Sequence, residues 1–80
     1  MDGVNRASLK WRCRRGMREL DLLLERFLAR DFDGLDDIHL PEFERLLEEP
    51  DQDILAWLSE SRPAPPAHRS MVAKIRAALD

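Results

Sequence analysis

The chain has 80 residues, of which 44% are hydrophobic and 36% are charged, and its formal net charge is -3. This length suits one small domain, and the composition is that of a folded protein rather than a disordered chain. No apolar run approaches the ~20 residues of a membrane span, and the first residues lack the apolar stretch of a secretory signal. We therefore expect one helical domain over residues 1–80, in the cytoplasm and without membrane insertion.

Two helices are predicted in the N-terminal half. The first is short and begins at about Ser8, because strand-forming residues are absent there and arginine favours helices. The second covers about residues 17–32, where leucines and Phe27 recur at the spacing that lines one helix face. Residues 31–37, DFDGLDD, combine a glycine with four acidic residues and predict a loop.

Three more helices are predicted in the C-terminal half. Residues 40–49 form one with Pro41 in its first turn, where a missing N–H costs nothing. Pro50 ends it, and the next helix begins with Asp51 as its N-cap. A stiff proline-rich connector at about residues 62–67 precedes a last helix over residues 68–80. The fold class is thus all-α, a compact bundle of about five short helices.

The residues needed for catalysis or metal binding are missing from this pattern. His39 and His68 have no suitable partner nearby in sequence and are expected to be surface or capping residues. Cys13, the single cysteine, cannot form an internal disulfide and is expected to be a small packing residue. No glycine-rich phosphate loop and no metal-ligand spacing occurs. We predict no catalytic, metal-binding or cofactor-binding residues, and no enzyme.

The charges are distributed unevenly along the chain. Residues 1–18 contain six basic side chains and one acidic one, whereas residues 31–60 contain eleven acidic side chains and one basic one. The acidic middle would repel phosphates, which argues against a nucleic-acid partner.

The segment RRGMRE, residues 14–19, supports two interpretations. In a structural one, Gly16 is the N-cap of the long helix and Glu19 accepts from its N–H as half of a capping box, or Gly16 closes the preceding helix in a left-handed conformation. In a functional one, Arg14, Arg15, Arg18 and Glu19 surround a glycine that lets a partner's backbone approach closely.

Trp11 lies one helical turn before these arginines. It is either an aromatic anchor of a binding surface or a core residue.

Two blocks of the sequence resemble a known family. NRASLKWRCRRGMRELDLLL is similar to the signature of the SdhE family, the small flavinylation assembly factors of succinate dehydrogenase, whose R-G-x-x-E core corresponds to Arg15, Gly16 and Glu19. LPEFERLLEEPDQDILAWL resembles the family's downstream stretch, L-L-E…D-x-D-[ILF]-[ILF]-x-W-L. The matching residues are Leu46, Leu47, Glu48, Asp51, Asp53, Ile54, Leu55, Trp57 and Leu58. The two blocks cover most of residues 5–59.

The resemblance implies a function in assembly. It predicts a five-helix bacterial protein that binds the flavoprotein subunit of succinate dehydrogenase, or of the related fumarate reductase, and promotes covalent attachment of FAD to a histidine of that subunit. FAD would belong to the client, with no cofactor held stably by this chain, which is expected to be a monomer. The predicted partner-binding residues are Trp11, Arg14, Arg15, Gly16, Met17, Arg18, Glu19, Asp51 and Asp53.

Some alternatives stay open at this point. Trp11, Asp51 and Asp53 are interface or structural residues, and a packing role is favoured for Trp57. The rival functions are an antitoxin-like or other regulatory protein-binding module and a small nucleic-acid-binding helical domain.

Overall fold

Five α-helices and one short 3₁₀ helix make up the computed structural model, which describes residues 5–79. In chain order they are α1 (Arg6–Arg12), α2 (Arg18–Arg30), η1 (Phe32–Gly34), α3 (His39–Leu47), α4 (Asp51–Leu58) and α5 (Pro66–Leu79). No strand occurs within these residues. The prediction of an all-α fold with about five short helices is confirmed.

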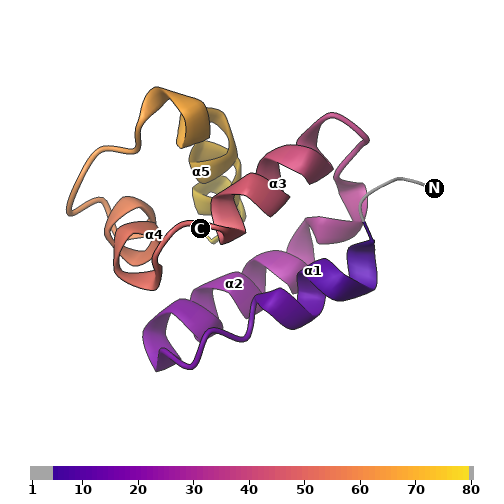
Figure 1. Ribbon diagram of the computed structural model, residues 1–80, viewed down its shortest axis with the longest axis horizontal. Helices are drawn as coiled ribbons and strands as arrows, with labels where there is room; N and C mark the ends of the chain where they lie inside the picture. The colour runs from indigo at the N-terminus through magenta and orange to yellow at the C-terminus, as the bar shows by residue number, and fades with distance from the viewer. Residues whose placement is uncertain (1–4, 80) are drawn as a thin grey trace.

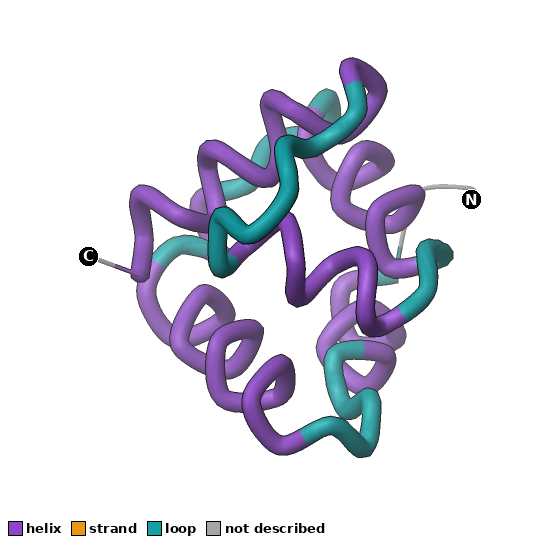
Figure 2. Tube along the Cα trace, turned by 90° about the vertical axis from the view of Figure 1, so that its left-hand side faces the viewer, coloured by secondary structure: helices purple, strands orange, loops and turns teal. Residues whose placement is uncertain are grey.

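The last helix holds the bundle together. α5 contacts α2, α3 and α4, and α2 also contacts η1 and α4. In Figure 1, α1 lies beside α2, and α4 with the long loop that follows it lies on the opposite side of the molecule. Figure 2 shows the loops at the outside of the bundle, which measures 37 × 26 × 23 Å.

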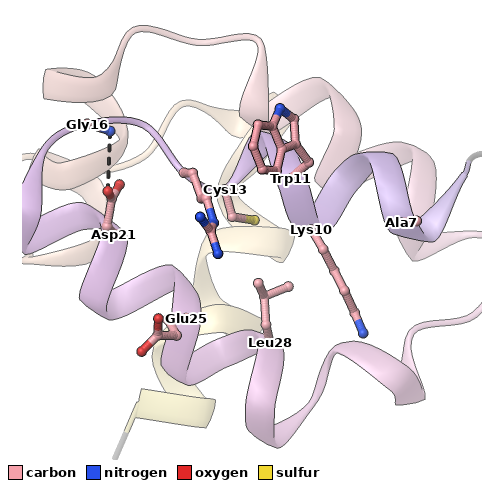
Figure 3. Close-up of a pocket in the computed structure, with 9 residues that line it drawn as sticks. Ala7, Lys10, Trp11, Cys13, Gly16, Asp21, Glu25 and Leu28 are labelled. Atoms are coloured by element: carbon pink, nitrogen blue, oxygen red, sulfur yellow. Dashed lines mark hydrogen bonds between the residues drawn. The ribbon is translucent and has the colours of Figure 1, made fainter.

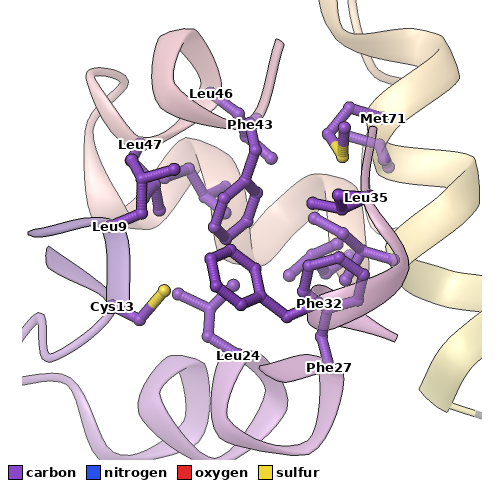
Figure 4. Close-up of a cluster of buried hydrophobic side chains, with 14 of the residues drawn as sticks. Leu9, Cys13, Leu24, Phe27, Phe32, Leu35, Phe43, Leu46, Leu47 and Met71 are labelled. Carbon is purple, nitrogen blue, oxygen red and sulfur yellow. The ribbon is translucent and has the colours of Figure 1, made fainter. Parts of the chain in front are cut away.

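Three phenylalanines form the centre of the core. The ring centroid of Phe43 lies 5.3 Å from that of Phe27 and 5.8 Å from that of Phe32, both at tilted angles that aromatic pairs favour. Figure 4 shows these rings facing one another, with Leu9 and Cys13 of the N-terminal segment beside them. Both residues are buried, so α1 is attached to the bundle by its own apolar face. The packing role predicted for Cys13 is confirmed.

The N-termini of the helices differ from the predicted pattern. α1 begins at Arg6 rather than near Ser8, because the Asn5 side chain accepts hydrogen bonds from the N–H groups of Ala7 and Ser8. Asp51 is not the N-cap of α4, and that prediction is wrong. Pro50 occupies the position in an extended conformation, while its carbonyl accepts from the backbone of α4.

The two segments predicted as loops are shorter than expected. Within residues 31–37 the chain forms η1, and the guanidinium of Arg6 donates to the carbonyls of Phe32 (3.1 Å) and Leu35 (2.5 Å). Helix α5 begins at Pro66, so the last residues of the predicted connector are helical. Proline is well suited to the first position of a helix because its fixed φ is already helical.

Candidate partner-binding site

The turn between α1 and α2 is closed by an aspartate. Gly16 has a φ of +86°, and the two carboxylate oxygens of Asp21 accept from the N–H groups of Arg15 (2.8 Å) and Gly16 (3.2 Å). Met17, not Gly16, is the N-cap of α2. The capping contact expected from Glu19 is therefore made by Asp21, and the interpretation of Gly16 as N-cap is wrong. Gly16 has the left-handed conformation considered above, but it does not close α1, which ends at Arg12 with Cys13 as its C-cap.

Arg15 points into the molecule and binds the junction between α3 and α4. Its Nε donates to Asp51 (2.6 Å), and its terminal nitrogens donate to the carbonyls of Leu47 (2.7 Å), Glu49 (3.0 Å) and Arg12 (3.2 Å). The Arg15 side chain is 15% exposed. The guanidinium thus joins two loops that are more than thirty residues apart in the chain, and we call this set of bonds the Arg15 clamp.

Gly16 and Glu19 face solvent beside the clamp. A Cβ built on Gly16 would meet no heavy atom within 4 Å, so the space in front of this backbone is open. The Glu19 side chain is exposed and, among residues 5–79, has no hydrogen-bond or ion-pair partner. The same holds for the neighbouring Arg18. Unpaired charges next to bare backbone are suited to bind another polypeptide.

Trp11 is 69% exposed, so a core role is wrong for it. The guanidinium carbon of Arg14 lies 5.4 Å from the centroid of its ring, which is a cation–π contact. An exposed tryptophan held by an arginine offers a large contact area, and its side chain loses little conformational entropy when a partner binds.

A groove lies between α1 on one side and the α1–α2 turn and α2 on the other. Its volume is about 770 Å³, and its lining includes Ala7, Lys10, Trp11, Cys13, Arg14, Gly16, Asp21, Glu25 and Leu28. Figure 3 shows Trp11 and Lys10 on the α1 side, Glu25 and Leu28 on the α2 side, and the bond between Gly16 and Asp21 at one end. Both charge signs and an apolar floor occur together, which suits a partner segment with mixed side chains.

The other predicted site residues have structural contacts. Met17 is half-buried and packs against the core. Asp51 binds the Arg15 clamp, and Asp53 forms an ion pair with Arg62. Trp57 is buried, so the packing role favoured for it is confirmed.

Sequence reasoning missed several residues of this surface. Asp21 was overlooked because its two partners are backbone groups, which leave no signal in the side-chain pattern. Lys10 and Glu25 line the groove, and nothing in the sequence distinguishes them from ordinary solvated charges. Leu22, which is 54% exposed, could have been found: it lies off the apolar stripe of α2, one turn after Glu19.

The cysteine that lines the groove is held as a neutral thiol. Burial raises the pKa of the Cys13 thiol to about 12, although Arg15 and Arg12 act in the opposite direction. Across residues 5–79, no set of three or more histidine, cysteine or acidic side chains is arranged to hold a metal ion. None of the helices in that range is both long and apolar enough to cross a membrane.

His68 is placed differently from the prediction. It is buried rather than on the surface, with its ring beside Trp57 and its Nε2 2.6 Å from a Glu49 oxygen. His39 is partly exposed, and its Nδ1 lies 2.7 Å from an Asp36 oxygen. The same oxygen accepts from the N–H groups of Ile38 and His39, so Asp36, not the His39 side chain, binds the free N–H groups at the start of α3.

Fold and surface together describe a small all-helical protein with a polar groove at one helix junction. Comparison with known proteins identifies its family. The model of the Sdh5 family, described as flavinator of succinate dehydrogenase, matches residues 7–79. The chain therefore belongs to this family, as the two sequence blocks predicted.

Several relatives carry the name FAD assembly factor SdhE. The protein from Legionella pneumophila (strain Paris) is 47% identical over 58 residues, which are 72% of this chain and 73% of the relative. That from Photobacterium profundum is 44% identical over 71 residues, 88% and 81% of the two chains. That from Haemophilus ducreyi is 33% identical over 81 positions, covering 100% and 99%.

Proposed function

We propose that this protein is a FAD assembly factor, which binds the flavoprotein subunit of succinate dehydrogenase and promotes covalent attachment of FAD to that subunit. The observation that carries the proposal is the family match over residues 7–79. The names of the relatives support the assembly role. The open junction at Gly16 supports binding through a protein surface.

The proposed mechanism is positioning without catalysis by this chain. Covalent attachment requires the flavin ring and the client's side chain to be held in reacting geometry. Orientation of this kind lowers an activation barrier by roughly several kcal/mol. A specific interface needs about 800 Å² on each partner, which is a modest part of the 5083 Å² surface of this chain. A complex of this size can also dissociate when the client takes up its other subunits.

In this proposal the residues around Gly16 divide the contact between them. Gly16 lets the client's backbone approach, and Glu19 accepts hydrogen bonds from client donors. Trp11 and Arg14 offer the client an aromatic and a cationic contact surface, and the Arg18 side chain offers it hydrogen-bond donors. Four residues support the proposed site indirectly, because their contacts within the chain hold its backbone in place: Arg15, Met17, Asp51 and Asp53.

The finer parts of the proposal follow from the family resemblance alone. The flavoprotein subunit of fumarate reductase is a second client, and the factor acts as a monomer in the bacterial cytoplasm. FAD is carried by the client, and no cofactor stays on this chain.

Two measurements test the function with purified protein and the apo flavoprotein subunit. Titration calorimetry gives the affinity, and in-gel flavin fluorescence after denaturation gives the covalent yield. Glu19→Ala should weaken binding by about tenfold or more, because charge-assisted hydrogen bonds are lost. Gly16→Arg should do the same by filling the open space, and circular dichroism checks that helix content is unchanged. Because any side chain is strained at the φ of +86°, Gly16→Ala, which adds the same strain with little bulk, should bind the client more tightly than Gly16→Arg.

Gly34→Arg is the control for the added bulk and charge alone. Gly34 is exposed, its φ is not left-handed, and the nearest atom to an added Cβ is 3.9 Å away. This variant should bind and flavinylate as the wild type does. A wild-type chain that neither binds the apo subunit nor raises its covalent flavin would refute the proposed function.

A further inference from the structure

His68 is the one polar or charged side chain that is buried among residues 5–79. It lies in the first turn of α5, outside both sequence blocks that carry the family resemblance. Its ring centroid is 5.5 Å from that of Trp57. Because a carboxylate can only accept, the Nε2–H of His68 donates to the Glu49 side chain at 2.6 Å.

Glu49 connects this histidine to the Arg15 clamp. Its side chain accepts from His68, while its carbonyl accepts from the guanidinium of Arg15 at 3.0 Å. The neighbouring carbonyl of Leu47 and the carboxylate of Asp51 complete the clamp on either side. One residue of the α3–α4 junction is therefore bonded to α5 by its side chain and to the α1–α2 turn by its backbone.

The junction needs such an anchor. Residues 48 and 50 are exposed, and the chain there is held by backbone bonds from Glu48 to Arg45 and from Glu49 to Leu46. Arg15 can form its bonds only if the carbonyls of Leu47 and Glu49 face it together. If the α3–α4 junction were mobile, forming each Arg15 hydrogen bond would first require the junction to be ordered. That ordering has an unfavourable conformational entropy and would weaken the clamp.

We propose that His68 is a positioning residue of the partner-binding site: through Glu49 it fixes the α3–α4 junction in the orientation that the Arg15 clamp requires. Arg15 in turn sets the backbone at Gly16, so a residue of the last helix determines how Gly16 and Glu19 are presented. This inference rests on the proposed function for its binding readout, and its structural readout is independent of any client.

Four variants separate the hydrogen bond from simple packing. His68→Phe keeps a ring beside Trp57 and removes the donor. His68→Gln keeps a donor of similar reach. Glu49→Ala removes the acceptor and leaves the ring contact in place. Arg76→Gln is the control, because it breaks an exposed ion pair between α5 and Glu60 that has no bond to the clamp.

The structural readout is hydrogen exchange at the Nε–H of Arg15, followed by NMR and assigned with an Arg15→Lys variant. His68→Phe and Glu49→Ala should each raise the exchange rate by about tenfold and weaken client binding by a similar factor, as expected for one lost charge-assisted bond. His68→Gln should restore most of both values. Arg76→Gln should change neither.

One result would overturn the inference: a folded His68→Phe or Glu49→Ala variant in which Arg15 exchange stays at the wild-type rate. If client binding were weakened in that variant, His68 would act on the site by another route. If His68→Phe does not fold, Glu49→Ala decides alone, since its site is a half-exposed loop. If the wild type binds no flavoprotein, the proposed function fails while the exchange data still decide the positioning role.

Discussion

Arg15→Lys tests the clamp directly. Arg15 makes four side-chain hydrogen bonds, to Asp51 and to three backbone carbonyls. A lysine ammonium keeps the charge but is a single point, so it cannot reach Asp51 and the distant carbonyl of Glu49 at once. We expect about two of the bonds to be lost, each worth about 1 kcal/mol net.

The ion pair with Asp51 adds little to this sum, because the Asp51 side chain is 32% exposed and water screens it. The expected loss is therefore about 2 kcal/mol, a large share of the stability of a domain near the low end of the ~5–15 kcal/mol range. With a urea m-value of about 1 kcal/mol/M, the unfolding midpoint should fall by about 2 M.

Arg14→Lys is the control, since Arg14 is exposed and contacts the ring of Trp11. It should change the free energy of unfolding by less than about 0.5 kcal/mol. Equal midpoint shifts for the two substitutions would show that the guanidinium of Arg15 does not bind the α3–α4 junction in solution.

Three further predictions concern other parts of the chain. Burial raises the pKa of Cys13 to about 12, so a thiol reagent at mildly alkaline pH should modify Cys13 only after urea unfolding. Any stability that the neutral thiol provides is lost as pH rises towards that value. The His39 backbone N–H, followed by its side chain, lowers the pKa of Asp36. NMR titration of Asp36 should therefore give a low midpoint, which should rise only in part in His39→Ala because that variant keeps the backbone N–H. The stabilising effect of the carboxylate, present at neutral pH, should disappear as pH falls through that midpoint. Glu60 has a φ of +66°, so the free energy of unfolding of Glu60→Gly should exceed that of Glu60→Ala by about 1 kcal/mol. Both variants lose the ion pair with Arg76, and only alanine keeps the left-handed strain. Equal stabilities in thermal unfolding would refute that strain.

The apolar pattern predicted most of the helices because it reports burial, and burial decides where helices form. The leucines of α2 recur at helical spacing, and the most buried of them, Leu20 and Leu24, contact the core through one face. Pro41 and Pro50 mark boundaries because proline lacks a backbone donor, an effect that depends only on local geometry.

The contacts of the candidate site depend instead on residues distant in the chain. Nothing in the sequence near Arg15 indicates that the carbonyls accepting its bonds lie in the α3–α4 junction. The same limit applies to His68, whose partner Glu49 is nineteen positions away. Asp21 replaces Glu19 at the turn because the residues before α2 adopt a conformation that brings both N–H groups to one carboxylate, which propensities do not encode.

The R-G-x-x-E core therefore combines two kinds of residue that the sequence places together. Arg15 is engaged inside the molecule, so its substitution should alter stability and binding together. The Glu19 side chain has no partner among residues 5–79, so Glu19→Gln should weaken client binding. Its loss of stability should stay below about 1 kcal/mol, the effect of one acidic side chain in the first turn of α2. Plotting affinity against the free energy of unfolding for both variants distinguishes these roles. If Glu19→Gln lost as much stability as Arg15→Lys, the carboxylate would be a structural residue, and the exposed junction would no longer support a docking surface.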